Sequence, residues 1–486
     1  MTNLHSAGLK QLEQRLKQEM TWLGLPAPQW SFPLFHPEGE VLDVAIIGAG
    51  MSGLAVAAAL KLKGLQPTVF DKAPAGLEGP WLTTALMETL RSPKNVVGPA
   101  LDLPSLTFAA WYQAQYGIEA WDDLDKISRQ EWARYLHWYR DVMDIEVRSE
   151  HEVLEVLPRD DKTVELIIFH AGNTRRYLTR RVILALGLEG FGRPDIPSWV
   201  DDLPRNLWTH SIEALDYSTL RGKRVAVVGA SAAAMDCAAT ALESDAEAVE
   251  LLIRRPTIPH LNRAKGAGSA GLTHAYRQLP DAWKWRLSYT IAKAQIAPPR
   301  GSTLRVTRHQ NVFINTGCPV TAVREEANAV TLTTPKGEFV VDHLILATGF
   351  RLDWAKHTAY ASFANELLLW RHRFTPSSDE ANDALGEHPY LGSGFEFQSR
   401  APDAVPGLDR IHCFCLASTL SMGHVIGAIP NTGLGAKQLA EIIAGKLYQE
   451  DEAQHFQKIL DYEEPELFGD EWIPALPPSL RNQSSN

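Results

Sequence analysis

The chain has few of the features that mark secreted, membrane or nucleic-acid-binding proteins. Its 486 residues include four cysteines, too few for a disulfide framework and typical of a reducing compartment. It has no apolar run long enough to span a bilayer, and its first residues lack the charged-then-apolar order of a secretory signal. Acidic residues outnumber basic ones, 58 against 47, which disfavours a nucleic-acid partner. We therefore expect a cytoplasmic protein that binds neither membrane nor nucleic acid.

What is present is typical of a soluble enzyme of two or three domains, with 45% hydrophobic and 22% charged residues. Residues 1–42 form an extension in which apolar side chains share one helical face up to a proline-rich stretch. The pattern predicts a helix that packs on the body. A dimer contact is the alternative, so a homodimer stays open. The apolar face consists of Leu9, Leu12, Leu16, Met20 and Leu23.

Two loops of small residues carry most of the functional information. Residues 43–53 read DVAIIGAGMSG and residues 224–234 read RVAVVGASAAA. Each follows a short apolar β-branched run and precedes a stretch typical of a helix, and a second apolar strand follows each helix. This alternation predicts an α/β fold with parallel, doubly wound sheets. Two such loops suggest two dinucleotides, and electron transfer between them is the economical reason for holding both.

The first loop matches G-x-G-x-x-G in the required context between a strand and a helix. Gly48 permits the tight turn, Gly50 lets the backbone approach a pyrophosphate, and Gly53 lets the helix pack on the strand, with its positive end at the phosphates. Asp71 ends the next strand, where a carboxylate can bond ribose hydroxyls. A plain tight turn is the alternative. The candidate binding residues are Gly48, Gly50, Met51, Ser52, Gly53, Asp71 and Lys72.

The second loop keeps its first glycine and replaces the other two with small residues, so close approach of a phosphate is retained. Its second strand ends in an arginine pair in place of an acid. A carboxylate there would repel a 2′-phosphate, whereas arginines would bind it, which favours NADP(H) over NAD(H). A solvated basic pair is the alternative. The candidate residues are Gly229, Ser231, Ala232, Ala234, Arg254 and Arg255.

A second feature also occurs twice. Residues 164–170 and 329–333 each begin an antiparallel excursion that returns to a buried strand ending in Ala-x-Gly, at Gly187 and Gly349. The glycine lets the chain turn close to a bound cofactor, which adds Thr348 and Gly349 to the candidate binding residues.

The order of these motifs resembles the class B flavin-dependent monooxygenases, which include the flavin-containing, N-hydroxylating and Baeyer–Villiger enzymes. The motifs that carry the resemblance cover about residues 42–440. They are the two loops, Glu78-Gly-Pro-Trp81, Leu90-Arg-Ser-Pro-Lys94, His210-Ser211, Ala347-Thr-Gly-Phe350 and Gly427-Ala-Ile-Pro430-Asn431-Thr432-Gly433.

The resemblance implies that the first loop binds FAD and the second NADPH, with Trp81 near the flavin. Residues 427–433, including Pro430, Asn431 and Thr432, would meet the flavin ring at a helix N-terminus, which stabilises negative charge on the reduced ring. The implied fold is an FAD domain, residues 43–205 and 341–486, interrupted by an NADPH domain, residues 206–340.

The implied reaction inserts one oxygen atom from O2 into a small organic substrate through a flavin C4a-(hydro)peroxide, which the protein shields from water. The candidate catalytic residues are Arg91, Lys94, His210 and Asn431. A cation such as Arg91 or Lys94 near the flavin would favour the anionic peroxide. Surface charges are the alternative for these two, and a packed or hinge residue is the alternative for His210.

Two other classes compete with a monooxygenase. One is an NADPH oxidoreductase or oxidase without oxygen transfer, whose disulfide-reductase form lacks a C-x-x-C dithiol. The other is a dinucleotide sensor without catalysis.

Residues 255–310 break the domain pattern and predict an insertion that serves as a lid or substrate wall. Its aromatic residues Trp283, Trp285 and Tyr289 either line a pocket or bury the insertion against the body.

Overall fold

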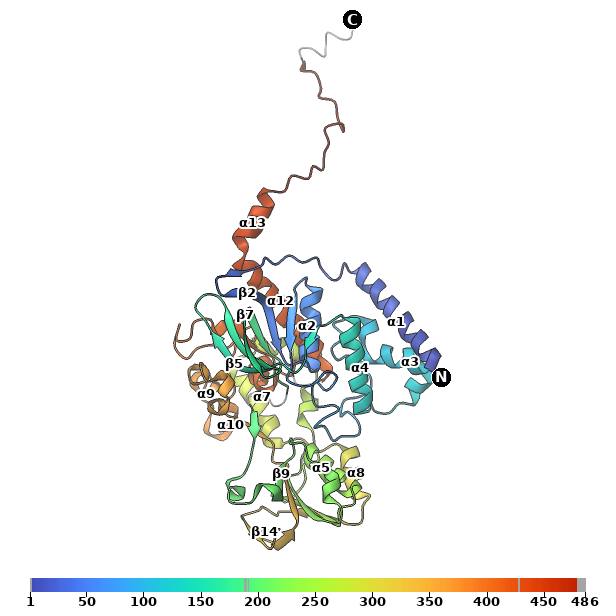
Figure 1. Cartoon of the computed structure of the whole chain (residues 1–486), viewed down its shortest axis with the longest axis vertical. Coiled ribbons are helices and arrows are strands. Elements are labelled where there is room, and N and C mark those ends of the chain that lie inside the picture. The colour runs from blue at the N-terminus through green and yellow to red at the C-terminus, as the bar shows by residue number, and fades with distance from the viewer. Residues whose placement is uncertain (1, 188–189, 191, 427–428, 479–486) are drawn as a thin grey trace. The chain divides into compact units, whose positions relative to one another are not determined.

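The structure is a computed structural model that describes residues 2–187, 190, 192–426 and 429–478 (Figure 1). The chain divides into two compact units, Met1–Ala444 and Gly445–Asn486. The first unit holds both glycine loops and every candidate site residue. Its two sheets, each built around a core of parallel strands, confirm the predicted α/β class with two dinucleotide-binding folds.

The first sheet has β2 at its centre, and the first glycine loop follows this strand. Its strand order is β4-β3-β2-β7-β6-β5, with β1 beside β2 and β18 beside the end of β7. The pairs that β2 makes with β3 and β7 are parallel, as are β3–β4 and β7–β18, whereas β5, β6 and β7 pair antiparallel. Residues Val44–Ile47 are buried because both faces of a parallel sheet are covered. The strands are β1 Phe35–His36, β2 Gly39–Ile47, β3 Pro67–Phe70, β4 Val147–Arg148, β5 Glu152–Pro158, β6 Val164–His170, β7 Asn173–Leu184 and β18 Ile411–Cys413.

The second sheet repeats this plan around the second loop. Its five strands are all parallel in the order β12-β11-β10-β16-β9, and β10 leads into the loop. An antiparallel three-stranded sheet, β13-β14-β15, precedes β16. The strands are β9 Trp208–His210, β10 Arg224–Val228, β11 Ala248–Ile253, β12 Val312–Thr316, β13 Ala322–Glu326, β14 Ala329–Thr334, β15 Gly337–Val341 and β16 His343–Leu346.

Two polar contacts fix β16 in this sheet. The Asp342 carboxylate accepts from the Arg224 backbone N–H and guanidinium, each at 2.8 Å, at the point where β15 ends and β16 begins. Thr209 Oγ1 and His343 Nε2 share a hydrogen bond of 2.7 Å between β9 and β16. β16 therefore pairs with the strand of the second loop, beyond residue 340, where the sequence analysis ended that domain.

One helix follows each loop and packs along its sheet. α2 (Met51–Leu62) follows the first and is buried along almost its whole length, and α5 (Ala232–Glu243) follows the second. α8 (Arg300–Thr307) packs on α5, and its buried Arg305 bonds the Glu243 carboxylate and the Leu86 carbonyl, the latter at 2.8 Å. Arg305 thus joins the second sheet's helices to the segment that precedes Arg91.

The two sheets are joined by a pair of short strands, β8 (Gly192–Pro194) and β17 (Phe350–Leu352), which run antiparallel. Thr348 Oγ1 donates to the Asp195 carbonyl at 2.6 Å, and the Asp195 N–H donates to the Gly349 carbonyl at 2.9 Å. These bonds hold the Ala347–Phe350 motif at the junction.

A helical group covers one side of the first unit. Figure 1 shows α1 (Thr2–Trp22) alongside α3 (Phe108–Asp123) and α4 (Arg129–Val142). Leu12 and Leu16 of α1 are buried, and Gly8 approaches α3 so closely that a Cβ there would lie 1.9 Å from the Ala114 carbonyl oxygen. The N-terminal helix therefore packs on the body, as the sequence predicted.

The insertion contains α6 (Ala270–Ala275) and α7 (Asp281–Ala294). Gln295 adopts a left-handed φ of 55°, which stops the helix. Trp285 is buried against Trp370 and Leu420, and its Nε1 donates to the Glu380 carbonyl at 2.9 Å. The insertion is thus buried against α9 (Trp370–Arg373), α10 (Asp383–Gly386) and α11 (Thr419–Met422).

The second unit begins within α12 (Thr432–Glu450) and continues with α13 (Glu452–Leu460). The described chain after α13 is almost wholly irregular, and apolar side chains such as Phe468 and Ile473 are exposed. None of the helices in the described part of the chain combines the length and the apolar character that crossing a bilayer requires.

Candidate active site

The first glycine loop has the close contacts that its glycines predict. Gly48 has a φ of 102°, and a Cβ on it would lie 2.6 Å from the Ala185 carbonyl oxygen at the end of β7. A Cβ on Gly53 would lie 1.8 Å from the Gly48 carbonyl oxygen. No side chain caps the start of α2 at Gly50. The first N–H groups of this helix, from Met51 and Ser52 onward, are therefore free for a phosphate.

The space in front of this loop fits the expected FAD. Gly50 faces the backbone of Gly79, with the nearest atom 3.7 Å from where its Cβ would be, so any side chain here would narrow the gap. The Trp81 Nε1 is buried and finds no acceptor in the described part of the chain. An uncapped helix end and a buried indole donor next to a narrow gap suit a ligand rich in oxygen and nitrogen acceptors.

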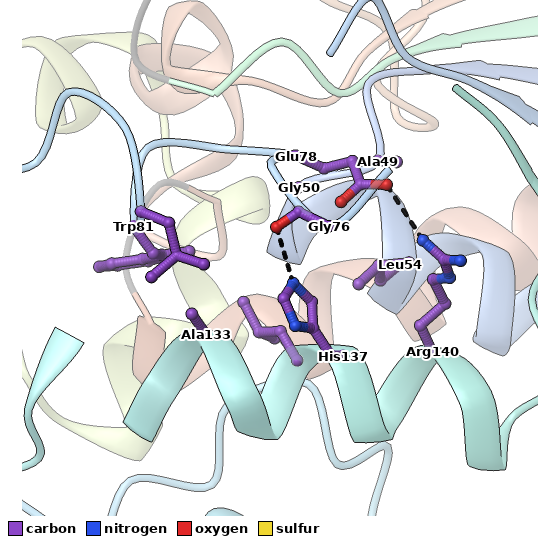
Figure 2. Close-up of a pocket in the computed structure, with 11 residues that line it drawn as sticks. Ala49, Gly50, Leu54, Gly76, Glu78, Trp81, Ala133, His137 and Arg140 are labelled. Atoms are coloured by element: carbon purple, nitrogen blue, oxygen red, sulfur yellow. Dashed lines mark hydrogen bonds and ion pairs between the residues drawn. The ribbon is translucent and has the colours of Figure 1, made fainter. Parts of the chain in front are cut away.

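Helix α4 supplies the opposite wall of the pocket. Figure 2 shows Gly50 and Leu54 on one side, and Ala133, His137 and Arg140 of α4 on the other. His137 Nε2 donates to the Gly76 carbonyl at 3.0 Å, and Arg140 forms an ion pair of 3.0 Å with Glu78, whose side chain is only 6% exposed. His137 and Arg140 are not among the site residues predicted from the sequence. Their i, i+3 spacing beside the apolar face of α4 was the available signal.

Asp71 holds the loop as well as facing the site. Its Oδ2 accepts from the Ala49 N–H at 2.6 Å, and its Oδ1 accepts from the Ala73 N–H at 2.8 Å. A carboxylate has about four acceptor positions, so two remain for hydroxyl groups. Lys72 beside it is exposed.

The second loop makes the same contact between its first glycine and a carbonyl oxygen as the first loop does. It differs in the capping of the helix that follows it. Gly229 has a φ of 142°, and a Cβ on it would lie 2.5 Å from the Ala347 carbonyl oxygen, as Gly48 lies against Ala185. Ser231 caps α5, because its Oγ accepts from the Ala234 N–H at 3.3 Å. The helix that begins at Ala232 therefore offers one N–H fewer than α2 does.

The arginine pair lies beside the second loop. The Gly229 N–H donates to the Leu252 carbonyl in β11, at 3.1 Å, and Arg254 and Arg255 follow this strand directly. Arg254 is exposed and forms no ion pair with any residue that the structure describes. Arg255 is half-buried, and its Nη2 donates to the Lys293 carbonyl in the insertion at 3.4 Å. Both positions suit a phosphate near the second loop.

His210 and the Ala347–Phe350 motif are brought together at the end of β9 and β16. His210 pairs in register with Leu346, is fully buried, and contacts the Phe350 ring edge-on at 5.7 Å between centroids. Burial lowers the pKa of His210, against the influence of Glu213 and the Gly349 backbone. His210 is therefore a neutral, packed side chain at the junction of the two sheets.

Arg91 and Lys94 lie on one loop and have different partners. Arg91 Nη2 donates to the Ala297 carbonyl of the insertion at 2.8 Å, and partial burial lowers its pKa. Lys94 Nζ donates to the Trp121 carbonyl at 2.6 Å and lies 5.1 Å from the centre of the Trp121 ring. Arg91 thus connects the loop of residues 90–94 to the insertion, whereas Lys94 holds the last turn of α3.

The start of α12 reaches the same site as the first loop. The Gly433 N–H donates to the Gly98 carbonyl at 3.1 Å, and Gly98 lies against the Trp132 ring, whose centre is 6.3 Å from that of Trp81. Asn431 Nδ2 donates to the His424 carbonyl at 3.3 Å.

Of the other residues in this motif, Pro430 is exposed and Thr432 is buried, whereas Gly427 and Ala428 lie outside the described residues.

The cysteines do not form a disulfide-reducing centre. Cys413 and Cys415 are buried, with 3.6 Å between their sulfur atoms, and burial raises the pKa of Cys413 well above its usual value. A buried thiol that stays protonated is a poor nucleophile. Among the described residues no cluster of His, Cys, Asp and Glu could hold a metal ion.

The sequence matches the family described as L-lysine 6-monooxygenase/L-ornithine 5-monooxygenase over residues 106–275, and that of FAD dependent oxidoreductases over residues 43–166. It is 33% identical over 463 residues to the FAD-dependent urate hydroxylase of Xanthomonas campestris pv. campestris. That alignment covers 95% of this chain and 98% of the relative.

Two solved structures share the fold. They are an ornithine hydroxylase from Pseudomonas aeruginosa (TM-score 0.64, 16% identity, 84% of this chain and 100% of that one) and an L-lysine 6-monooxygenase from Pseudomonas syringae (TM-score 0.64, 18% identity, 84% of this chain and 99% of that one). At these identities the likeness concerns the fold alone.

Proposed function

Because this chain belongs to the class B flavin-dependent monooxygenases, we propose that it hydroxylates a small anionic heterocycle, with urate as the first candidate. It is an FAD- and NADPH-dependent enzyme that transfers one atom of O2 to its substrate. The observation that carries the substrate proposal is the 33% identity to a urate hydroxylase over nearly the full length of both chains.

FAD, once bound and reduced by NADPH, supplies the activation of O2. The chain's own residues bind it and exclude water. We assign its pyrophosphate to Gly48, Gly50 and the N–H groups that begin α2, because this helix end is uncapped. Asp71 would bond the ribose with its remaining acceptor positions, and the Trp81 indole would donate to the cofactor.

NADPH is assigned to the second loop, with its 2′-phosphate on Arg254 and Arg255. The free guanidinium of Arg254 and its place at the carboxyl end of β11, beside β10, support this assignment.

For the domains, we propose the predicted FAD domain at 43–205 and 341–486 around an NADPH domain at 206–340. The pairing of β16 with β10 favours moving the second boundary to the junction strand β17.

Arg91 is the residue we assign to charge stabilisation near the flavin. Its side chain is exposed and its guanidinium bonds a neutral carbonyl, so its charge is available to an anion. The same hydrogen bond ties Ala297 of the insertion to the loop that carries Arg91. Lys94, bound to the end of α3, would position the loop that carries Arg91. His210 would hold the nicotinamide side of the junction, and Asn431 the start of α12.

The direct test uses the purified, FAD-loaded enzyme. We expect urate to accelerate NADPH oxidation and to disappear in proportion to the NADPH and O2 consumed, with little hydrogen peroxide. The measurements are absorbance of NADPH and urate, an oxygen electrode and a peroxide assay on the same reaction. If urate changed neither the rate nor the peroxide yield, and all electrons from NADPH appeared as peroxide, the enzyme would be an oxidase towards urate and the substrate proposal would be wrong.

A further inference from the structure

The insertion carries two basic side chains that no part of the assigned cofactor sites explains. Lys284 lies on α7, and Arg277 lies in the turn that precedes it. Both are half-buried, and neither forms an ion pair with any residue in the described ranges. Basic side chains on a solvated helix face usually extend into water, so partly buried ones without an acidic partner call for another explanation.

Lys284 is partly shielded from water. Burial lowers its pKa, and the neighbouring Arg277 lowers it further, while Asp281 acts in the opposite direction. Asp281, whose influence is the larger of these two, also accepts a hydrogen bond at Oδ2 from the Tyr390 hydroxyl at 3.0 Å. The ammonium group therefore has both a cation and a carboxylate near it, and it forms no ion pair with a described residue.

Arg277 places this pair next to α12. Its Nη1 donates to Gln438 Oε1 at 3.2 Å, and Gln438 lies on the helix whose first turn reaches the site of the first loop. The preceding Tyr276 lies against Gly423, where a Cβ would be 2.7 Å from the tyrosine ring, and its hydroxyl donates to the Leu420 carbonyl at 3.2 Å. The two cations thus lie where the insertion covers α11 and α12, away from the β10–β11 edge that holds Arg254 and Arg255.

We propose that Lys284 and Arg277 form the subsite that binds the negative charge of the substrate. Two partly dehydrated cations repel each other. An anion bound by both would offset this electrostatic repulsion and would accept charge-assisted hydrogen bonds from both side chains. Urate is an anion, and its oxygen atoms are acceptors for both an ammonium and a guanidinium group. Gln438, bonded to Arg277, holds the guanidinium in place. This inference rests on the proposed function, because it names the part of that site that selects for an anion.

The test compares Lys284→Gln and Arg277→Gln with a matched control, Lys293→Gln. Lys293 lies on the same helix and is exposed, with its ammonium over the Tyr289 ring. Urate affinity is measured by titrating the oxidised, FAD-loaded enzyme and following flavin absorbance, and KM is measured for urate and for NADPH. We expect each subsite variant to weaken urate binding about tenfold or more, with KM for NADPH unchanged and the control like the unmodified enzyme. Lys284→Arg, which keeps the charge, should recover part of the affinity.

The subsite is wrong if both Gln variants, with normal FAD content and circular dichroism, bind urate as tightly as the unmodified enzyme. It is also wrong if they raise KM for NADPH as much as KM for urate, since that would assign the pair to the phosphates. If the unmodified enzyme neither binds nor hydroxylates urate, the proposed function fails separately. The subsite is then decided with benzoate, a planar anion, as the probe: weaker benzoate binding by both variants supports it, and equal binding overturns it.

Discussion

The preference for NADPH over NADH is the property most directly tied to single side chains. Arg254 follows β11 at the edge of the second loop, is exposed, and has no ion pair within the described chain. Replacing it with alanine therefore removes a free guanidinium and disturbs no other contact. Arg255→Ala differs, because that side chain also bonds the Lys293 carbonyl and so helps to fix the insertion.

A hydrogen bond to a charged group contributes about 1.5–3 kcal/mol, which is about a 10–150-fold change in a dissociation constant. We expect Arg254→Ala to weaken NADPH binding by a factor in this range. NADH binding should hardly change, because NADH lacks the 2′-phosphate. The double variant should lose more NADPH affinity than either single variant.

The assay is the rate of flavin bleaching under anaerobic conditions, recorded at a series of NADPH and NADH concentrations. Arg263→Ala is the control, since this exposed arginine follows the same strand but does not adjoin the loop. High salt should also reduce the preference of the unmodified enzyme for NADPH over NADH, as Arg254→Ala does, because salt screens the attraction between the guanidinium and the phosphate. An equal loss of affinity for NADPH and NADH in Arg254→Ala would refute the assignment of the 2′-phosphate.

Three further outcomes follow from the contacts. Gly53→Ala should abolish tight FAD binding, since its Cβ would lie 1.8 Å from the Gly48 carbonyl oxygen. Ala234→Gly, at the equivalent position of the second loop, should leave FAD binding unchanged. Flavin fluorescence titration measures FAD binding in both variants. Burial, with nearby cations, lowers the pKa of His343 to about 4 from 6.5, so its contribution to stability is complete above pH 6.5 and falls by about 3 kcal/mol as the pH drops to about 4. Urea unfolding between pH 6.5 and 4 should show that the free energy of unfolding falls less for His343→Gln than for the unmodified enzyme. An equal fall in the two proteins would contradict this prediction. Arg305→Met should lower the free energy of unfolding by about 3 kcal/mol, because it leaves the Glu243 carboxylate with one exposed arginine partner; an unchanged urea midpoint would argue against this.

The repeated strand–loop–helix units were predictable because their signal is local. The helix expected after the first loop is α2 (Met51–Leu62), and the strand expected before the second is β10 (Arg224–Val228). Apolar runs of the right period, small residues and a glycine at each turn all indicate the same local structure. The contact of each first glycine with a returning strand could also be expected, since both returns end in Ala-x-Gly.

Other parts of the site depend on contacts between distant segments. His137 and Arg140 join the pocket because α4 lies against α2, and nothing near them in the sequence identifies the partners Gly76 and Glu78. The bond between Arg91 and the Ala297 carbonyl spans two segments whose pairing no local pattern encodes. β18 has only three residues, and its place beside β7 is set by tertiary packing.

The two glycine loops close on strands that leave the ribosome at different times. Gly48 lies against Ala185, which is synthesised before the second loop, whereas Gly229 lies against Ala347. The first sheet also needs β18, which is synthesised after the whole second sheet. During translation the nascent chain can therefore shape the first loop early, and it completes the surrounding sheet only once the second nucleotide fold has emerged.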